Sequence, residues 1–283
     1  MNISFLEKNY QKTYDSPNIK VNLKDLFMSD YAQLLHEARI KAEPIEQLTA
    51  SGVKLTRMSA YEVQEKGISL RESEGEKVIG LKMGLTSEAK RKQMDLDAPL
   101  YGVLTDKMEI QNNGLYTMEG KIHPKAEPEV AFMFSKELDS TMSYDEVFSS
   151  IKWAAPAIEI LDSRYKQFKY FSMEDVISDN SSSSYFIVGE SFEVKSKEDY
   201  FDKKLKFLVN GEIAFEGNSN AISDDPLNSI LELARLMEAR RKKVPANVVI
   251  LAGAATAAVA LEAGMTVSLE VEGMKKVEFK VEA

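Results

Sequence analysis

The sequence predicts an α+β protein in which helices come first and strands follow. Apolar residues recur at helical spacing in the part of the chain before residue 78. From Val78 onward, short apolar runs and alternating runs typical of β-strands dominate, and one amphipathic helix over 225–243 interrupts them. Because helices and strands are segregated along the chain rather than alternating, we do not expect a βαβ architecture.

The N-terminal region, residues 1–77, is expected to be helical. One helix is predicted within Ser29–Glu43, and Pro44 ends it because proline breaks the hydrogen-bond ladder of a helix. A second helix is predicted over Ser59–Lys66, with its first serine as the N-cap. The charged stretch Ser69–Lys77 is expected to be mobile. The first helix rests on four apolar residues at helical spacing, which are Tyr31, Leu34, Leu35 and Ala38.

Most of the remaining chain, residues 78–283, is expected to form strands. Lys203–Asn210 and Glu212–Phe215 are predicted to pair as a hairpin, because Asn210-Gly211 is the strongest two-residue turn signal. The other predicted strands lie at 78–85, 122–134, 154–161, 185–189, 248–251, 266–272 and 276–281.

One strong helix signal lies inside this strand region. Asp225 is a capping residue, and Pro226 follows at the first helical position. The basic run Arg240–Lys243 is interpreted as the C-terminal end of the helix, where positive charge is favourable, with a phosphate site as the alternative. The buried face is predicted to carry Leu227, Ile230, Leu231, Ala234 and Met237.

The composition excludes several classes of protein. The chain has 283 residues, no cysteine and only two histidines, so disulfides, Cys-ligated metals, thiol nucleophiles and His-rich metal sites are not expected. The formal charge is 36 − 45 = −9, which argues against a general nucleic-acid binder. The N-terminus does not read as a signal peptide, and the apolar stretch Val248–Leu261 is too short to span a bilayer. We therefore expect a cytoplasmic protein with no membrane or nucleic-acid partner.

A pair of acids stands in the most informative segment. If Glu127–Phe134 is a strand, Glu127 and Glu129 point to the same face, and Val130, Phe132 and Phe134 to the other. Two neighbouring carboxylates repel each other unless a cation or a proton lies between them. A solvated strand face is the simpler interpretation, and a cation site is the functional one.

A third acid, Glu159, lies inside the apolar run AAPAIEIL at 154–161. A buried carboxylate needs a partner, and a salt bridge to Arg164 would supply one. The alternative is a metal site formed together with Glu127 and Glu129. Oxygen ligands without cysteine suit Mg²⁺ or Mn²⁺ better than Zn²⁺, and a 2-oxo acid substrate could chelate an ion held in this way.

Lys82 stands in GLKMGL, a run that is otherwise apolar or glycine. Such a lysine usually extends outward to water, but if it points inward, it becomes a plausible acid or base. Four glycines are interpreted as turns or close backbone approaches, because no phosphate-loop motif and no GxSxG motif occurs. They are Gly80, Gly84, Gly253 and Gly264.

Several long blocks, in the same order, resemble the fumarylacetoacetase-like superfamily over most of 78–281. The branch is that of the 2-oxopent-4-enoate hydratases and 4-oxalocrotonate decarboxylases of aromatic meta-cleavage catabolism. The blocks are VIGLKMGLTS at 78–87, APLYGVLTDKM at 98–108, HPKAEPEVAF at 123–132, AIEILDSRYKQFKY at 157–170, SDNSSSSYFIVG at 178–189, DPLNSILELA at 225–234 and VVILAGAATAA at 248–258.

The resemblance implies a mixed β-sheet roll wrapped by helices, which forms a catalytic domain over 78–283 after the helical region 1–77. It implies Mg²⁺ or Mn²⁺ as cofactor, held by Glu127, Glu129 and Glu159. The catalytic residues that it implies are Lys82, Asp106 and Arg164, and the substrate-binding residues are His123, Lys125, Ser163 and Leu85.

The local sequence favours the decarboxylase over the hydratase. His-Pro-Lys before the acid pair, Asp-Ser-Arg-Tyr after Glu159, and GLKMGLTS are similar to the decarboxylase branch. The expected reaction is decarboxylation of 2-oxohex-3-enedioate to 2-hydroxypenta-2,4-dienoate. The expected substrate is therefore a small 2-oxo acid. A hydratase, an acylpyruvate-type C–C hydrolase and a non-catalytic subunit are the alternatives. The resemblance also implies a homo-oligomer and a possible complex with a related hydratase.

The sequence departs from the family pattern at three places. Pro128 replaces a usual alanine, and since proline cannot donate to a ladder, it must lie at a sheet edge or at a non-bonded position. Asn247 replaces a usual glycine or aspartate, and Met274-Lys275 replaces a glycine-rich turn. The first 77 residues match poorly. These departures do not change the three predicted metal ligands, but they affect the prediction of which substrate is bound.

Overall fold

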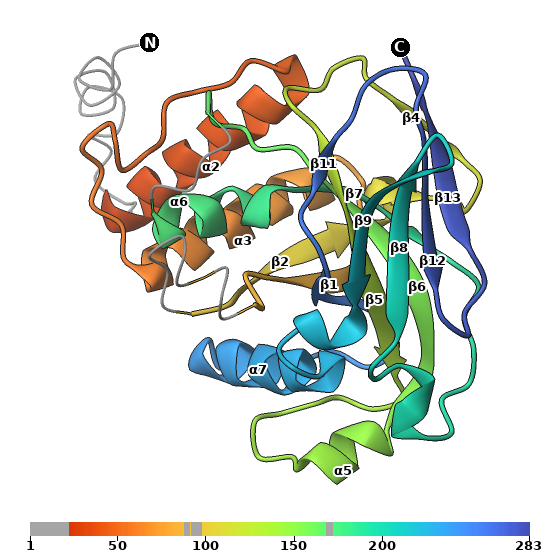
Figure 1. The fold of residues 1–283 in the computed structure, drawn as a ribbon. Coiled ribbons are helices and arrows are strands. Elements are labelled where there is room, and N and C mark those ends of the chain that lie inside the picture. The colour runs from red at the N-terminus through yellow and green to blue at the C-terminus, as the bar shows by residue number, and fades with distance from the viewer. Residues whose placement is uncertain (1–22, 88–90, 92–97, 168–171) are drawn as a thin grey trace.

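The computed structural model describes residues 23–87, 91, 98–167 and 172–283. Within them a curled eight-stranded mixed sheet has the order β2-β1-β10-β5-β6-β7-β3, with β11 paired to β5, and a five-stranded sheet has the order β4-β13-β12-β8-β9 (Figure 1). This confirms the predicted α+β class and its mixed sheet. The strands are β1 Val78–Gly84, β2 Leu100–Thr105, β3 Glu109–Ile110, β4 Leu115–Thr117, β5 Lys125–Phe134, β6 Ile151–Leu161, β7 Ser183–Val188, β8 Lys204–Val209, β9 Glu212–Asn218, β10 Val249–Ala254, β11 Val259–Ala260, β12 Thr266–Val271 and β13 Val277–Glu282.

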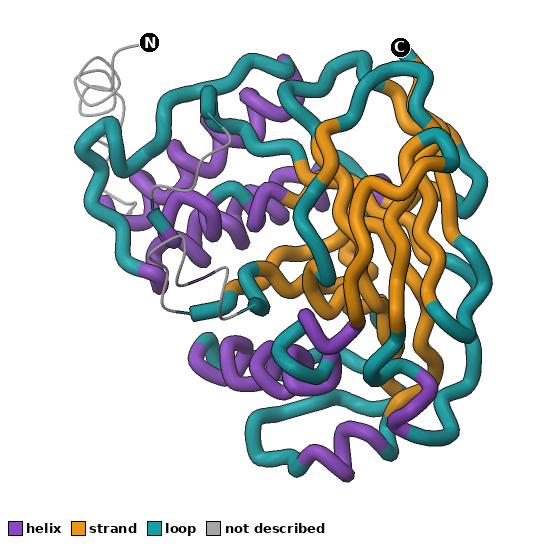
Figure 2. The backbone as a smooth tube through the Cα atoms, in the orientation of Figure 1, coloured by secondary structure: helices purple, strands orange, loops and turns teal. Residues whose placement is uncertain are grey.

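The helices gather mainly on one side of the strands, as Figure 2 shows. None of the helices in the described ranges is long and apolar enough to cross a membrane. They are α2 Leu23–Lys41, α3 Arg57–Ser73, α5 Tyr144–Phe148, α6 Met173–Ser178 and α7 Pro226–Ala239, with 3₁₀ turns η1 Asp106–Met108, η2 Asn180–Ser182, η3 Lys197–Asp199 and η4 Ser219–Ala221.

The second N-terminal helix is longer than the sequence predicts. Thr56, not Ser59, is its N-cap, and the two side chains form a reciprocal capping box. The expectation of a mobile Ser69–Lys77 is wrong over its first part, because α3 continues to Ser73. Arg71 explains the difference, since its buried side chain pairs with Glu76 at 2.8 Å and holds the charged segment against the fold.

The predicted hairpin and the predicted late helix are both confirmed. Asn210 and Gly211 adopt φ values of 52° and 82° between β8 and β9, the left-handed conformation that this tight turn requires. The Asp225 carboxylate accepts a hydrogen bond from the backbone of Leu227 and caps α7. Arg240 follows the helix as its C-cap and pairs with a glutamate of α3, so the basic run is a helix end as interpreted.

The main core lies between the two sheets. It takes Val130, Phe132 and Phe134 from one face of β5, together with Phe207 and Phe279 from the five-stranded sheet. All five side chains are fully buried. The opposite face of β5 therefore turns away from this core, and the pleat places the two acids of β5 on that face.

Candidate functional site

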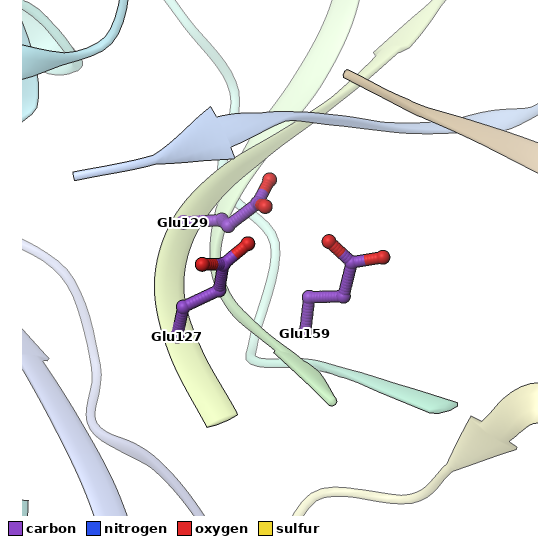
Figure 3. A group of neighbouring side chains, drawn as sticks. All are labelled: Glu127, Glu129 and Glu159. Carbon is purple, nitrogen blue, oxygen red and sulfur yellow. The ribbon is translucent and has the colours of Figure 1, made fainter. Parts of the chain in front are cut away.

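Three carboxylates converge where β5 and β6 run side by side (Figure 3). Glu127 lies directly across the strand pair from Glu159, and Glu129 follows two residues later on the same face. Each offers an oxygen atom, and these three atoms lie within 4.8 Å of one another. Glu129 and Glu159 are 1% and 0% exposed, so this is not a solvated strand face. We call these three residues the carboxylate triad.

Two triad members are held in place by donors from other segments. The backbone N–H of Gly253 donates to Oε2 of Glu129 at 2.7 Å. The hydroxyl of Ser183 donates to Oε1 of Glu159 at 2.7 Å. The second oxygen of Glu129, Oε1, is buried and has no hydrogen-bond partner within the described residues. A buried unpaired carboxylate oxygen is costly, so it marks a place that a cation would occupy.

Lys82 points inward, which settles the two interpretations of its position on β1. Its side chain is 2% exposed, and its Nζ lies 2.8 Å from Oε2 of Glu159. The same ammonium donates to the hydroxyl of Ser181 at 3.2 Å. Two glycines leave room for this arrangement, because a Cβ on Gly102 would lie 3.1 Å from the lysine chain and one on Gly84 only 2.8 Å from the serine hydroxyl.

The triad carries more negative charge than its surroundings balance. Three carboxylates and one ammonium sum to −3 + 1 = −2 when all are ionised. Burial, with the charges of Glu159 and Glu127, raises the pKa of Glu129 well above its usual value. Burial acts to lower the pKa of Lys82, but the three carboxylates outweigh it and raise that pKa. Oxygen ligands and excess negative charge fit Mg²⁺ or Mn²⁺.

A strained turn positions the site, and sequence reasoning missed its role. Asn180, Ser181 and Ser182 all have positive φ, at 50°, 56° and 56°, which is rare for residues other than glycine. Ser181 contacts Lys82, and the next strand residue, Ser183, contacts Glu159. The run of four serines was the available signal, but it does not by itself show which hydroxyls turn inward.

Arg164 does not pair with Glu159, so the expected salt bridge is wrong. Its guanidinium instead contacts the buried carboxylate of Asp179. It also donates to the carbonyl oxygens of Asp162, at 2.7 Å, and Ser183, at 3.1 Å. Burial raises the pKa of Asp179 to about 6, although the adjacent arginine opposes this shift. The observed contacts of Arg164 therefore link β6 to the strained turn.

Of three further predicted site residues, one lies on the triad face and two make their observed contacts with other segments. Lys125 begins β5 on the triad face, two residues before Glu127. His123 is half-buried, its backbone N–H donates to Asp162 at 2.8 Å, and burial lowers the pKa of its ring. Asp106 accepts the backbone N–H of Lys77, just before β1 begins, so its observed contact is away from the triad.

Ser163 and Leu85 have local backbone roles. The buried hydroxyl of Ser163 accepts the backbone N–H of Tyr165 at 3.3 Å. Leu85 follows β1 with φ at 57°, and its carbonyl accepts from Arg91 at 2.7 Å. Whether either residue contacts a substrate stays a prediction.

Pro128 lies in a central strand, not at an edge. It lies just beyond the register shift of β10, next to Glu129, whose partner Ala254 is the last residue of β10. Its carbonyl accepts from the backbone of Ala255 at 2.9 Å. The proline is tolerated because regular pairing with β10 ends at Ala254 and pairing with β11 begins only at Ala126, so the ladder needs no N–H from residue 128.

Comparison with known proteins adds three findings. Residues 84–282 match the family model described as fumarylacetoacetate (FAA) hydrolase C-terminal. The chain is 37% identical to a 4-oxalocrotonate decarboxylase of a Pseudomonas species, over 89% of this chain and 97% of the relative. It is 31% identical to a 2-hydroxyhexa-2,4-dienoate hydratase of Comamonas testosteroni, over 88% of this chain and 95% of the relative.

A solved structure is similar over nearly the whole chain. It is the 4-oxalocrotonate decarboxylase from Pseudomonas putida G7, complexed with magnesium and adipate. The TM-score is 0.86 at 31% identity, and the match covers 93% of this chain and all of the other. These relatives are lyases, and both a decarboxylase and a hydratase are found among them.

Proposed function

The chain belongs to the fumarylacetoacetate hydrolase C-terminal family, and we propose that within it this protein is a metal-dependent 4-oxalocrotonate decarboxylase. The substrate is 2-oxohex-3-enedioate, and the products are CO₂ and 2-hydroxypenta-2,4-dienoate. The observation that carries the proposal is the carboxylate triad, with two buried members, one lysine beside it and an oxygen on Glu129 that has no hydrogen-bond partner among the described residues. The relative solved with magnesium and a six-carbon dicarboxylic acid supports the same cofactor and substrate class.

The reaction needs a stabilised negative charge on the 2-oxygen. When the C5–C6 bond breaks, CO₂ leaves and its electron pair moves through C3–C4 to that oxygen, which then takes a proton. Mg²⁺ or Mn²⁺ held by Glu127, Glu129 and Glu159 would supply a Lewis acid for the 1-carboxylate and the 2-oxo group. The protein keeps this charge stabilisation effective by burying Glu129 and Glu159, since low polarity strengthens electrostatic interactions.

Lys82 is proposed to orient the substrate and to supply a proton to the developing dienolate. Glu159 and Ser181 both contact its ammonium group. These contacts hold the side chain in one conformation, so the ammonium is already oriented before the substrate binds. The carboxylates beside Lys82 keep it protonated, as the raised pKa indicates. It is therefore suited to donate a hydrogen bond or a proton, and not to act as a base in the resting state.

The distal carboxylate of the substrate needs a cationic partner, and we propose Lys125. It lies on the triad face of β5, one pleat repeat from Glu127, which is about 7 Å along a strand. That spacing suits a six-carbon chain whose first two oxygens lie at the triad. Arg164 is a weaker candidate because Asp179 already pairs with it, and His123 because burial favours its neutral form.

A hydratase acting on 2-hydroxypenta-2,4-dienoate is the second candidate. The similarity to hydratases over most of both chains favours it, and the same triad would bind that product-like substrate. The two activities differ at the distal end, because only the decarboxylase substrate has a second carboxylate. A cationic Lys125 therefore supports decarboxylation as the first choice.

The two activities are separated by offering both substrates to the same magnesium-loaded sample. Release of CO₂ from 2-oxohex-3-enedioate, with no consumption of 2-hydroxypenta-2,4-dienoate, is the expected result. Consumption of the pentadienoate without CO₂ release from the dicarboxylate would assign the hydratase. Inactivity toward both would contradict the proposal.

We further propose that the protein is a homo-oligomer and can associate with a hydratase that consumes its product. Ile213 and Phe215 on β9, the edge strand of the five-stranded sheet, are 49% and 37% exposed and support a contact with a second copy. Light scattering on the purified protein tests this. A monomer that stays monomeric at micromolar concentration would contradict it.

A further inference from the structure

The ammonium group of Lys82 already occupies part of the carboxylate triad. Its Nζ lies 2.8 Å from Oε2 of Glu159, and the side chains of both residues are almost completely buried. The other oxygen of Glu159, Oε1, accepts a hydrogen bond from the hydroxyl of Ser183 at 2.7 Å. Both oxygens of this predicted metal ligand are therefore engaged before a metal binds. Oε1 of Glu129 differs, since it has no hydrogen-bond partner among the described residues.

The lysine serves as a counter-cation in the metal-free protein. Without it, three carboxylates whose oxygens lie within 4.8 Å of one another would carry a charge of −3. Like charges this close repel each other, and the repulsion is strong where burial removes water. The ammonium reduces the sum to −2 and so helps to hold the triad together. A divalent cation at the same carboxylates would meet this positive charge and be repelled by it.

A second anchor for the ammonium lies on the strained turn. Ser181 offers its hydroxyl at 3.2 Å and its carbonyl oxygen at 3.5 Å from Nζ of Lys82. Asn180 fixes this turn, because its side-chain amide exchanges hydrogen bonds of 2.8 and 2.9 Å with the backbone of Val103 on β2. The ammonium thus has two anchors, the carboxylate and the turn, and a small movement is enough to favour one over the other.

We propose that the ammonium of Lys82 competes with the divalent cation for the triad and thereby limits metal affinity. In the metal-free protein it pairs with Glu159 and balances part of the negative charge. When Mg²⁺ or Mn²⁺ binds, the ammonium gives up that pair and is retained by Ser181. This role is separate from proton donation, and it rests on the metal site of the proposed function. The lysine thus keeps the triad assembled without metal and makes metal binding weaker than three carboxylates alone would allow.

Calorimetric titration of the metal-stripped protein with Mn²⁺ measures this competition without any turnover. Lys82→Met removes the positive charge and should bind Mn²⁺ about tenfold more tightly or better. Lys82→Gln also removes the charge but keeps a hydrogen-bond donor near Glu159, and it should show a gain of similar size. Ser181→Ala should bind about threefold more weakly, because the ammonium then has one anchor fewer outside the triad. Lys206→Met on exposed β8 is the matched control and should bind as the wild type does.

The direction of the change separates competition from a structural role, since a lysine that only shaped the site would weaken metal binding when removed. Thermal unfolding gives a second readout. Saturating Mn²⁺ should raise Tm more in Lys82→Met than in the wild type, because a ligand that binds more tightly stabilises the folded state more. The proposal is overturned if the wild type binds Mn²⁺ and both Lys82 variants bind it no more tightly, or if Ser181→Ala does not weaken binding. If the wild type itself does not bind Mn²⁺, the metal site of the proposed function fails as well.

Discussion

Two clusters of charged side chains, one with unbalanced charge and one with balanced charge, lie on either side of the turn over residues 179–183. The carboxylate triad sums to −2 with its lysine. In the cavity between α2, α3 and the turn, three arginines are each paired with a carboxylate, so their charges are balanced; the pairs are Arg39–Glu74, Arg71–Glu76 and Arg164–Asp179. Both contain buried polar atoms without partners in the described chain. Since unmatched charge is costly to bury, the triad indicates a bound cation, whereas the paired arginines require no ion. The difference is that strand pleating assembles the triad, whereas tertiary packing assembles the cavity.

The largest expected effect is on metal affinity at the triad. Glu129→Gln removes a ligand whose Oε1 has no hydrogen-bond partner in the described part of the chain and should weaken Mn²⁺ binding about a hundredfold or more. Glu270→Gln, the same change on the exposed face of β12, should not alter it. Calorimetric titration of metal-stripped protein measures both.

The same variant should have the opposite effect on the metal-free fold. Glu129→Gln relieves repulsion among buried carboxylates and should stabilise the metal-free protein by about 1 kcal/mol, or roughly 2–4 °C in Tm. Equal metal affinity in both variants, or a lower Tm for Glu129→Gln without metal, would refute the charge imbalance that we describe.

Lys82→Met sharpens the comparison because it removes the cation of the triad. The rate constant for the chemical step should fall by about 10²–10³, since the substrate loses a proton donor. The metal-free protein should also become less stable, because the charge of the cluster changes from −2 to −3. Lys206→Met on exposed β8 is the matched control for both measurements. Unchanged turnover in Lys82→Met would exclude its proposed role.

The sequence shows the triad but not the cavity, and the reason is physical. Glu127 and Glu129 share a face by the two-residue period of a strand, and Glu159 is conspicuous within an apolar run, so local pattern is enough. The cavity draws Arg39 and Arg71 from two helices and Arg164 from a loop beyond β6, and no local pattern brings these together. The same reason explains why the sequence suggested Glu159 as the partner of Arg164. The actual partner, Asp179, is brought to Arg164 by tertiary packing.

Lys125→Met tests the distal end of the site. It should raise KM for 2-oxohex-3-enedioate about tenfold or more, because the second carboxylate loses its charged partner. The affinity for 2-hydroxypenta-2,4-dienoate, measured as product inhibition, should barely change, since that molecule has no carboxylate there. Steady-state kinetics with added product gives both values. If KM and the product inhibition constant rose by the same factor, Lys125 would not be the partner of the distal carboxylate.

The smallest expected effect is a pH dependence of stability from His123. Burial lowers its pKa below 6.5, so the unfolded chain binds this proton more readily. The contribution of neutral His123 to the free energy of unfolding is fully present above pH 6.5. It is lost as pH falls through 6.5 toward the folded pKa. Asp179, with a pKa raised to about 6, acts in the opposite direction below pH 6. Denaturant unfolding should therefore show a smaller loss between pH 7 and pH 5.5 in His123→Gln than in the wild type.

The most direct test is CO₂ release from 2-oxohex-3-enedioate by metal-stripped protein as Mg²⁺ is titrated in. We predict negligible release without metal, a saturable increase with Mg²⁺, and no increase in Glu129→Gln at the same concentrations. Release that is independent of Mg²⁺, or that is as fast in Glu129→Gln as in the wild type, would contradict a metal-dependent decarboxylation at the carboxylate triad.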